Sequence, residues 1–131
     1  MRITRECDYA LRIMTMLLKA DENSVVDANT ISQKQNIPSR FTVKILHKLV
    51  GAGFIKSKKG SNGGYYVAEM EKVTLLDIVQ AIDGPIEVNR CVGDENKCDM
   101  DKTSCSVHHI MADINEHIVS KLKSIKLNEL I

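Results

Sequence analysis

SRFTVKILHKLVGAGFIKSKKGSNGGYYVA, residues 39–68, joins a helical pattern to a basic, glycine-rich one. Apolar residues at helical spacing predict a helix over residues 39–52, which glycine ends. Its predicted inward side chains are Phe41, Ile45, Leu46, Leu49 and Val50. Strand candidates follow at 54–57 and 65–68, and the segment between them carries two lysines at a turn rich in glycine. The stretch therefore predicts a helix followed by a basic β-hairpin.

The flanking sequence adds further helices. Thr4 caps a predicted helix to about Lys19, a short helix fits within residues 29–36, and Thr74 caps another that ends at Gly84-Pro85. A last helix begins near Ser104 or Ser106, with a sustained apolar stripe of Val107, Ile110, Met111, Ile114, Ile118, Leu122 and Ile125. We expect a mainly α fold with a small β-hairpin wing, a winged helix-turn-helix followed by a long C-terminal dimerisation helix.

Three parts follow from this pattern: a winged helix-turn-helix domain at 1–84, a cysteine-bearing loop at 85–104 and a dimerisation helix at 105–131. The interface would consist of Ile110, Ile114, Ile118 and Leu122. We expect this stripe to need a second copy of the chain, because nothing after the helix is expected to fold back over it.

Composition and charge limit the function. The 131 residues are 44% hydrophobic, with no apolar run near the roughly 20 residues of a membrane span, so we expect a cytoplasmic protein without a membrane partner. Residues 28–68 hold seven Lys or Arg and no acid, whereas residues 83–101 hold six acids and two basic residues. This segregation predicts a basic surface for a polyanion and an acidic region with another role.

The basic stretch predicts binding to double-stranded DNA. Arg40 and Lys44 lie one helical turn apart and can reach phosphates or guanine edges, while the wing lysines can reach the DNA backbone. The predicted contacts are Ser39, Arg40, Thr42, Lys44, Lys58, Lys59 and Asn62. The alternative for any single lysine is a solvated helix face, but 41 residues without an acid favour DNA.

Cysteine spacing predicts a metal site. Cys91, Cys98 and Cys105 are separated by six residues each time, in a segment without secondary-structure periodicity. Three thiolates suit an iron-sulfur cluster. Zinc sites usually show closer cysteine pairs, and a metal-free thiol redox switch is the other alternative. Cys7 falls on the apolar face of the first helix, so we place it in the core.

Several motifs resemble one family of regulators. They are Met1-Arg-Ile-Thr4, Asp8-Tyr-Ala-Leu-Arg12, Ile37-Pro38, Ile45-Leu-His-Lys-Leu-Val-Gly-Ala-Gly53, Gly60-Ser-Asn-Gly-Gly-Tyr65 and Asp83-Gly84. Together they resemble the Rrf2 family, which includes IscR-like and NsrR-like proteins. The resemblance implies a homodimer on a pseudo-palindromic operator, with three cysteines holding an iron-sulfur cluster. Thr42-Val43 stands where members often carry Leu-Glu, so the operator sequence does not carry over.

The resemblance also implies two candidates for the fourth ligand. His108 resembles the histidine ligand of IscR-like members, and Asp8 resembles the carboxylate that the other subunit supplies in NsrR-like members. The alternative for His108 is an exposed polar residue, and the alternative for Asp8 is an acid in the first turn of a helix, where the helix dipole favours it. A two-iron and a four-iron cluster both stay open, since the cysteine spacing differs slightly from that usual in the family.

The expected function is a DNA-binding repressor whose cluster responds to nitric oxide, redox or iron-sulfur status, with Asp8 favouring nitric oxide. The same fold with zinc, or with bare thiols as a redox switch, is the alternative. A hypothesis from another functional class is a small iron-sulfur redox protein or enzyme. A third hypothesis is a pure interaction module. No HExxH, nucleophile or phosphate-loop motif is present, so we expect no enzyme.

Overall fold

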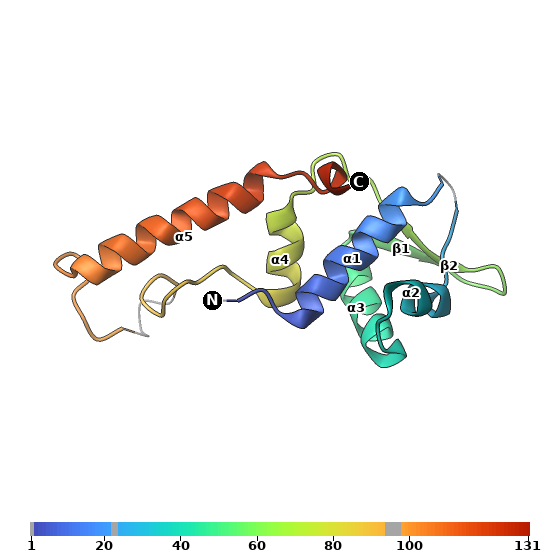
Figure 1. Cartoon of the computed structure of the whole chain (residues 1–131), viewed down its shortest axis with the longest axis horizontal. Helices are drawn as coiled ribbons and strands as arrows, with labels where there is room; N and C mark the ends of the chain where they lie inside the picture. The colour runs from blue at the N-terminus through green and yellow to red at the C-terminus, as the bar shows by residue number, and fades with distance from the viewer. Residues whose placement is uncertain (1, 22–23, 94–97) are drawn as a thin grey trace.

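The computed structural model describes residues 2–21, 24–93 and 98–131. Four helices and the hairpin form a packed body, from which a long helix, α5, projects as an arm (Figure 1). The elements in chain order are α1 (Arg5–Lys19), α2 (Ala28–Gln35), α3 (Ser39–Gly51), β1 (Ile55–Lys58), β2 (Gly64–Val67), α4 (Leu75–Asp83), α5 (Ser106–Ser124) and a 3-10 helix (Leu127–Leu130). The predicted fold class, mainly α with a small β-hairpin wing, is confirmed.

Side chains at the helix starts explain where three helices begin. Thr4 accepts a hydrogen bond from the backbone N–H of Cys7 at 3.1 Å. Asp27 accepts one from the N–H of Thr30 at 2.7 Å. At α4, Thr74 forms a capping box with the residue at the third helical position. Each cap satisfies a backbone donor that has no partner within its helix.

The hairpin is tied to the helices at its root. Residues 55–58 pair antiparallel with residues 64–67. Tyr65 also exchanges two backbone hydrogen bonds with Val26, at 2.8 and 3.0 Å. A Cβ at Gly64 would lie 2.7 Å from the Val26 carbonyl oxygen, so only glycine permits this close approach. The wing therefore starts from a fixed base beside the segment that joins α1 to α2.

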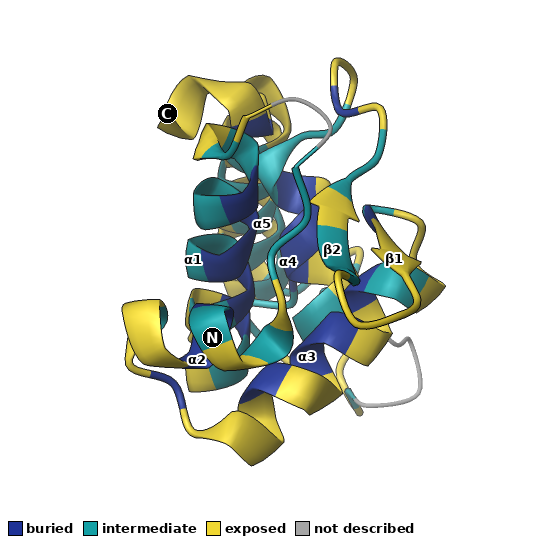
Figure 2. Cartoon of the chain, turned by 90° about the vertical axis from the view of Figure 1, so that its right-hand side faces the viewer, coloured by how far each residue is buried: buried dark blue, intermediate teal, exposed yellow. Residues whose placement is uncertain are grey.

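The core lies between α1, α2 and α3, where Figure 2 shows buried residues on the facing sides of the helices. The start of α3 differs from the sequence prediction, because Phe41 is 46% exposed and Thr42 is fully buried. Thr42 precedes Ile45 and Leu46 by three and four residues and so shares their face. The predicted inward position of Phe41 is wrong. Its ring lies edge-on to that of Tyr9, with centroids 6.3 Å apart.

The residues after α5 return to the packed body. The carbonyl of Ile125 accepts a hydrogen bond from the N–H of Leu75 at 2.8 Å, and the N–H of Leu127 donates to the carbonyl of Val73 at 2.9 Å. Leu127 is fully buried in the core. The residues after α5 thus pack against the body of the fold, while Ile110 and Ile114 of the α5 stripe stay exposed. Among the described residues, no helix is both long and apolar enough to cross a membrane.

Candidate nucleic-acid interface and cysteine segment

The outward face of α3 is cationic. Arg40, Lys44 and His47 follow each other at spacings of three and four residues and are all exposed. Glu6 on α1 faces the flank of this surface: its Oε1 lies 2.7 Å from Lys48 Nζ and 3.8 Å from Lys44 Nζ. Because α3 and the hairpin contain no acid of their own, this face keeps a positive potential suited to a polyanion.

Two further positions on α3 change the predicted interface. Ser39 is exposed at the helix start, as a DNA contact requires. The buried Thr42 donates its hydroxyl to the carbonyl of Pro38 at 3.3 Å, which corrects its predicted place among the DNA contacts. Val43, which the sequence analysis did not place among the DNA contacts, is 42% exposed on the cationic face. Its spacing of three residues from the preceding arginine was the available signal.

The wing presents its polar side chains to solvent. Lys58, Lys59 and Asn62 are all exposed. The tip turns tightly, since the N–H of Gly63 donates to the carbonyl of Gly60 at 3.0 Å. A Cβ at Gly63 would lie 2.1 Å from the Lys58 carbonyl oxygen, and Gly60 has φ 112°. These glycines allow a narrow, positively charged tip that projects beyond the helices (Figure 1).

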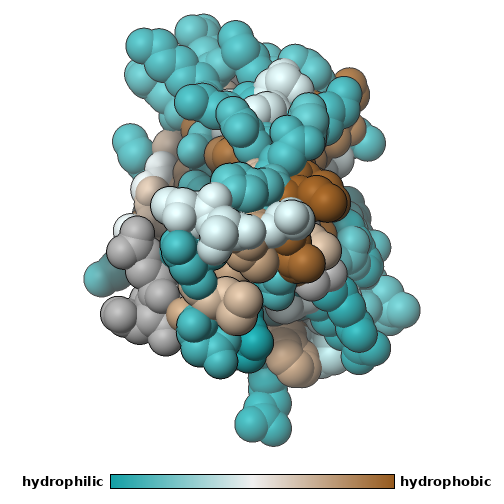
Figure 3. All heavy atoms as spheres, turned by 90° about the vertical axis from the view of Figure 1, so that its left-hand side faces the viewer, coloured by the Kyte–Doolittle hydropathy of each residue, from teal (hydrophilic) through white to brown (hydrophobic). Residues whose placement is uncertain are grey.

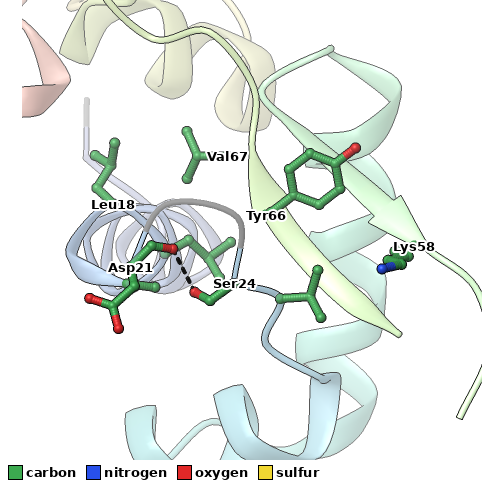
Figure 4. Close-up of a pocket in the computed structure, with 9 residues that line it drawn as sticks. Leu18, Asp21, Ser24, Lys58, Tyr66 and Val67 are labelled. Atoms are coloured by element: carbon green, nitrogen blue, oxygen red, sulfur yellow. Dashed lines mark hydrogen bonds between the residues drawn. The ribbon is translucent and has the colours of Figure 1, made fainter. Parts of the chain in front are cut away.

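A hollow of about 610 Å³ separates the end of α1 from the hairpin. Figure 4 shows Leu18 and Asp21 on one side and Tyr66 and Lys58 on the other. The Ser24 hydroxyl donates to the Asp21 carbonyl at 2.7 Å. Among the described residues that line the hollow, Lys58 is the one cation, and it already belongs to the wing.

The three cysteines of the predicted cluster site are free thiols along the segment between α4 and α5. Cys91 is buried, and the Asn89 side-chain amide donates to its sulfur at 3.5 Å. Cys98 and Cys105 are half-buried. Residues 94–97 of the predicted loop lie outside the described residues. In the part of the chain that is described, no three His, Cys, Asp or Glu side chains gather into a metal-holding group.

The two candidate fourth ligands have different surroundings. His108 stands on the first turn of α5, three residues after Cys105, the N-cap of that helix. Its Nδ1 is buried and has no hydrogen-bond partner among the described residues. Asp8 lies exposed on α1, with its Oδ2 3.4 Å from Nη1 of Arg12. The histidine thus offers a bare nitrogen, whereas the carboxylate offers oxygens in a weak surface ion pair.

Cys7 is chemically distinct from the other cysteines. It is fully buried beside α4, which confirms its predicted place in the core. Burial, and then the nearby Asp83 carboxylate, raise the pKa of the Cys7 thiol to about 12. Because the thiolate is both the nucleophile and the metal ligand, this thiol is inert at neutral pH.

The apolar stripe of α5 divides into two halves. None of its residues is fully buried. Ile110 and Ile114 are 60% and 41% exposed. Figure 3, which views the molecule from the end at which α5 begins, shows apolar side chains among hydrophilic ones. Ile118 and Leu122 instead pack against the buried cluster that α4 contributes to. Only the first half of the stripe is therefore left uncovered.

Sequence comparisons identify the family. The model of the Rrf2 family, described as "Iron-dependent Transcriptional regulator", matches residues 3–131. The chain is similar to the HTH-type transcriptional regulator IscR of Xenorhabdus nematophila, with 28% identity over 132 residues, 100% of this chain and 79% of that protein. A putative HTH-type transcriptional regulator of Haemophilus influenzae is 32% identical over 133 residues, 100% of this chain and 87% of that one.

Solved structures share the fold. CymR, the global cysteine regulator of B. subtilis, matches 99% of this chain and 95% of its own at 24% identity, with a TM-score of 0.82. IscR of T. potens matches 99% and 85% at 19% identity, with a TM-score of 0.79. The sequence relatives are transcriptional regulators rather than enzymes. Taken with the winged helix and the family match over residues 3–131, they show that the chain belongs to the Rrf2 family of DNA-binding transcriptional regulators.

Proposed function

We propose that the protein is a homodimeric repressor whose affinity for its operator depends on an iron-sulfur cluster held by Cys91, Cys98 and Cys105. The observation that carries the proposal is the unpartnered, buried Nδ1 of His108, on the first turn after Cys105. A buried polar atom without a hydrogen bond costs on the order of 1–3 kcal/mol, which a bond to a metal would offset. The description of the family as iron-dependent also supports the proposal.

The donor set fits such a group. Three thiols provide the soft ligands that iron-sulfur clusters prefer, and the fourth ligand is His108 or Asp8 of the partner subunit. The cluster has two or four irons. When bound, it supplies a centre that reacts with nitric oxide and oxygen and that changes its charge on oxidation or reduction.

The chain's own contacts link the cysteine segment to α5. The N–H of Val88 donates to the Asn115 side-chain oxygen at 3.0 Å, and Ile86 is buried beside Ile118. These contacts make the position of α5 depend on how the segment is folded. We therefore assign residues 1–84 to DNA binding, 85–104 to the cluster and 105–131 to dimerisation.

DNA contact is assigned to α3 and the wing. Ser39, Arg40 and Lys44 would enter the major groove, where serine, arginine and lysine read base edges or hold phosphates. Lys58, Lys59 and Asn62 would reach the adjacent backbone from the wing. Their common exposure and the lack of acids between residues 28 and 68 support this assignment.

Dimerisation is assigned to the stripe of α5, with Ile110 and Ile114 at its centre and Ile118 and Leu122 at its edge. Burying a large aliphatic side chain contributes about 2 kcal/mol, so the two exposed isoleucines of each subunit favour pairing. A two-fold dimer places two copies of α3 on two half-sites, which makes the operator pseudo-palindromic.

Anaerobic purification of the full chain tests the cluster. The protein should absorb visible light and contain iron and acid-labile sulfide, and Cys98→Ala should lose both signals. Cys7→Ala is the matched control and should keep them, because the Cys7 thiol is buried with a raised pKa. One of His108→Ala and Asp8→Ala should leave a cluster that decays faster in air than that of the other.

Other results would redirect the proposal. If the purified protein contains zinc and no iron, the three cysteines form a zinc site. If it is colourless and metal-free and its DNA binding in gel shifts responds to oxidants, the cysteines act as a thiol switch. Full colour in Cys98→Ala would contradict the assignment of the three ligands.

With the cluster intact, treatment with nitric oxide should change the affinity of the parent protein for operator DNA in gel shifts.

A further inference from the structure

Two neighbouring residues on α3 lie where their polarity would not place them: the polar one is buried and the apolar one is exposed. Thr42 is fully buried, while Val43 is 42% exposed. The two side chains have nearly the same shape and differ by a hydroxyl in place of a methyl group. If folding alone decided these positions, a valine would fill the buried position without needing the hydrogen bond that the Thr42 hydroxyl donates to the Pro38 carbonyl, and a threonine would suit the exposed one.

Stability does not explain the exposed valine. Val43 is a member of neither buried cluster of the described residues, and a β-branched residue in a helix is less favourable than most alternatives. Single exposed apolar residues are common on protein surfaces. This one, however, shares the outward face of α3 with Arg40, Lys44 and His47, all polar or charged and all exposed.

We propose that Val43 determines operator specificity by contacting the C5-methyl group of a thymine in the major groove. This inference rests on the proposed role of α3 as the DNA-contacting helix. The thymine methyl is the one apolar group on the edges of unmodified base pairs in that groove, and small apolar side chains recognise it. Arg40 and Lys44 complement the charge of the DNA backbone on either side of the contact.

The rigidity of the side chain suits this role. Valine in a helix occupies one χ1 rotamer almost exclusively, so its two methyl groups point in a fixed direction. A rigid apolar group loses little conformational entropy on binding, and its position selects one base pair rather than several. Each half-site should therefore contain one thymine whose methyl group contacts Val43.

Deoxyuridine substitution tests the contact, because deoxyuridine lacks only the methyl group. Operators are first selected from a pool of random duplexes with the purified full chain. Each thymine is then replaced in turn by deoxyuridine. One position per half-site should weaken binding by about fourfold, the effect expected for one buried methyl, and by about fifteenfold when both half-sites are changed.

The protein variants complete the test. Val43→Ala should weaken binding to the thymine operator by a similar factor and should lose its sensitivity to deoxyuridine at that position. Lys44→Ala is the control: it should bind more weakly but keep the sensitivity. Urea unfolding should show no loss of stability in either variant, because both side chains are exposed and alanine is at least as favourable in a helix.

Two results overturn the inference in distinguishable ways. If Val43→Ala keeps the full deoxyuridine effect while Arg40→Ala and Lys44→Ala bind weakly, then α3 contacts DNA but Val43 reads no methyl group. If none of the three substitutions changes binding, then α3 is not the contacting helix and the proposed role of α3 fails as well.

Discussion

α3 and α5 both carry an apolar stripe at helical spacing, but only α3 buries its stripe within one chain. α3 has four buried residues, Thr42, Ile45, Leu46 and Leu49, whereas the 19 residues of α5 have none. The packed body thus satisfies its own apolar surface, and the arm does not. The uncovered half of the α5 stripe is the surface that the proposed dimer would bury, whereas the core of the packed body is completed within the chain by Leu127, which follows α5.

The largest expected effect comes from charging the exposed half of α5. Ile110→Glu combined with Ile114→Glu places four carboxylates in the proposed dimer seam. The variant should sediment as a monomer and lose specific operator binding by about a thousandfold or more, because one half-site alone retains little more than non-specific affinity. Both residues are exposed in the single chain, so circular dichroism should still report a folded winged domain.

Ser120→Glu is the matched control for that variant. It adds charge to an exposed position of the same helix outside the apolar stripe and should stay dimeric. A dimer of parental size with glutamate at both isoleucine positions would show that the subunits pair through another surface.

A smaller effect is expected in the core of the packed body. Leu46→Ala removes a fully buried side chain and should lower the free energy of unfolding by about 2–5 kcal/mol in urea titrations. Phe41→Ala, on the same helix, should cost about 1 kcal/mol or less, because that ring is 46% exposed. Equal losses would contradict the burial assigned to the two positions.

The smallest effect is expected at the wing. Lys59→Ala should weaken binding to all DNA sequences alike and reduce the slope of log affinity against log salt concentration by about one, since one phosphate contact is lost. Lys121→Ala, an exposed lysine on α5, is the control and should leave the slope unchanged. A parental slope in Lys59→Ala would remove this lysine from the DNA contacts.

Local signals predicted most of the packed body. Thr4 and Thr74 cap their helices as expected, and the apolar periodicity located α1, α3 and α4 within a few residues. The prediction failed at the start of α3, where the helical spacing of apolar residues allows either position 41 or position 42 to face the core. Thr42 is buried there in place of Phe41. Periodicity alone does not decide such an edge position, because packing against a neighbouring helix does.

Contacts distant in sequence escaped prediction. The return of the chain after α5 depends on backbone pairing between residues 73–75 and 125–127, which no local pattern encodes. The ion pair of Glu6 with Lys48 is of the same kind. The sequence placed Cys91, Cys98 and Cys105 in one segment, but the geometry of the proposed metal site would depend on a cofactor and a second chain, neither of which a single sequence specifies.

The backbone pairing of Thr74 with Lys126 has an evolutionary consequence. It brings together the two ends of the segment that contains α4, the cysteines and α5. A segment whose ends lie side by side can be lengthened, shortened or replaced without displacing what precedes and follows it. Mutation can therefore remodel the cysteine loop and the outer part of the arm while the helices and wing that are proposed to contact DNA keep their positions.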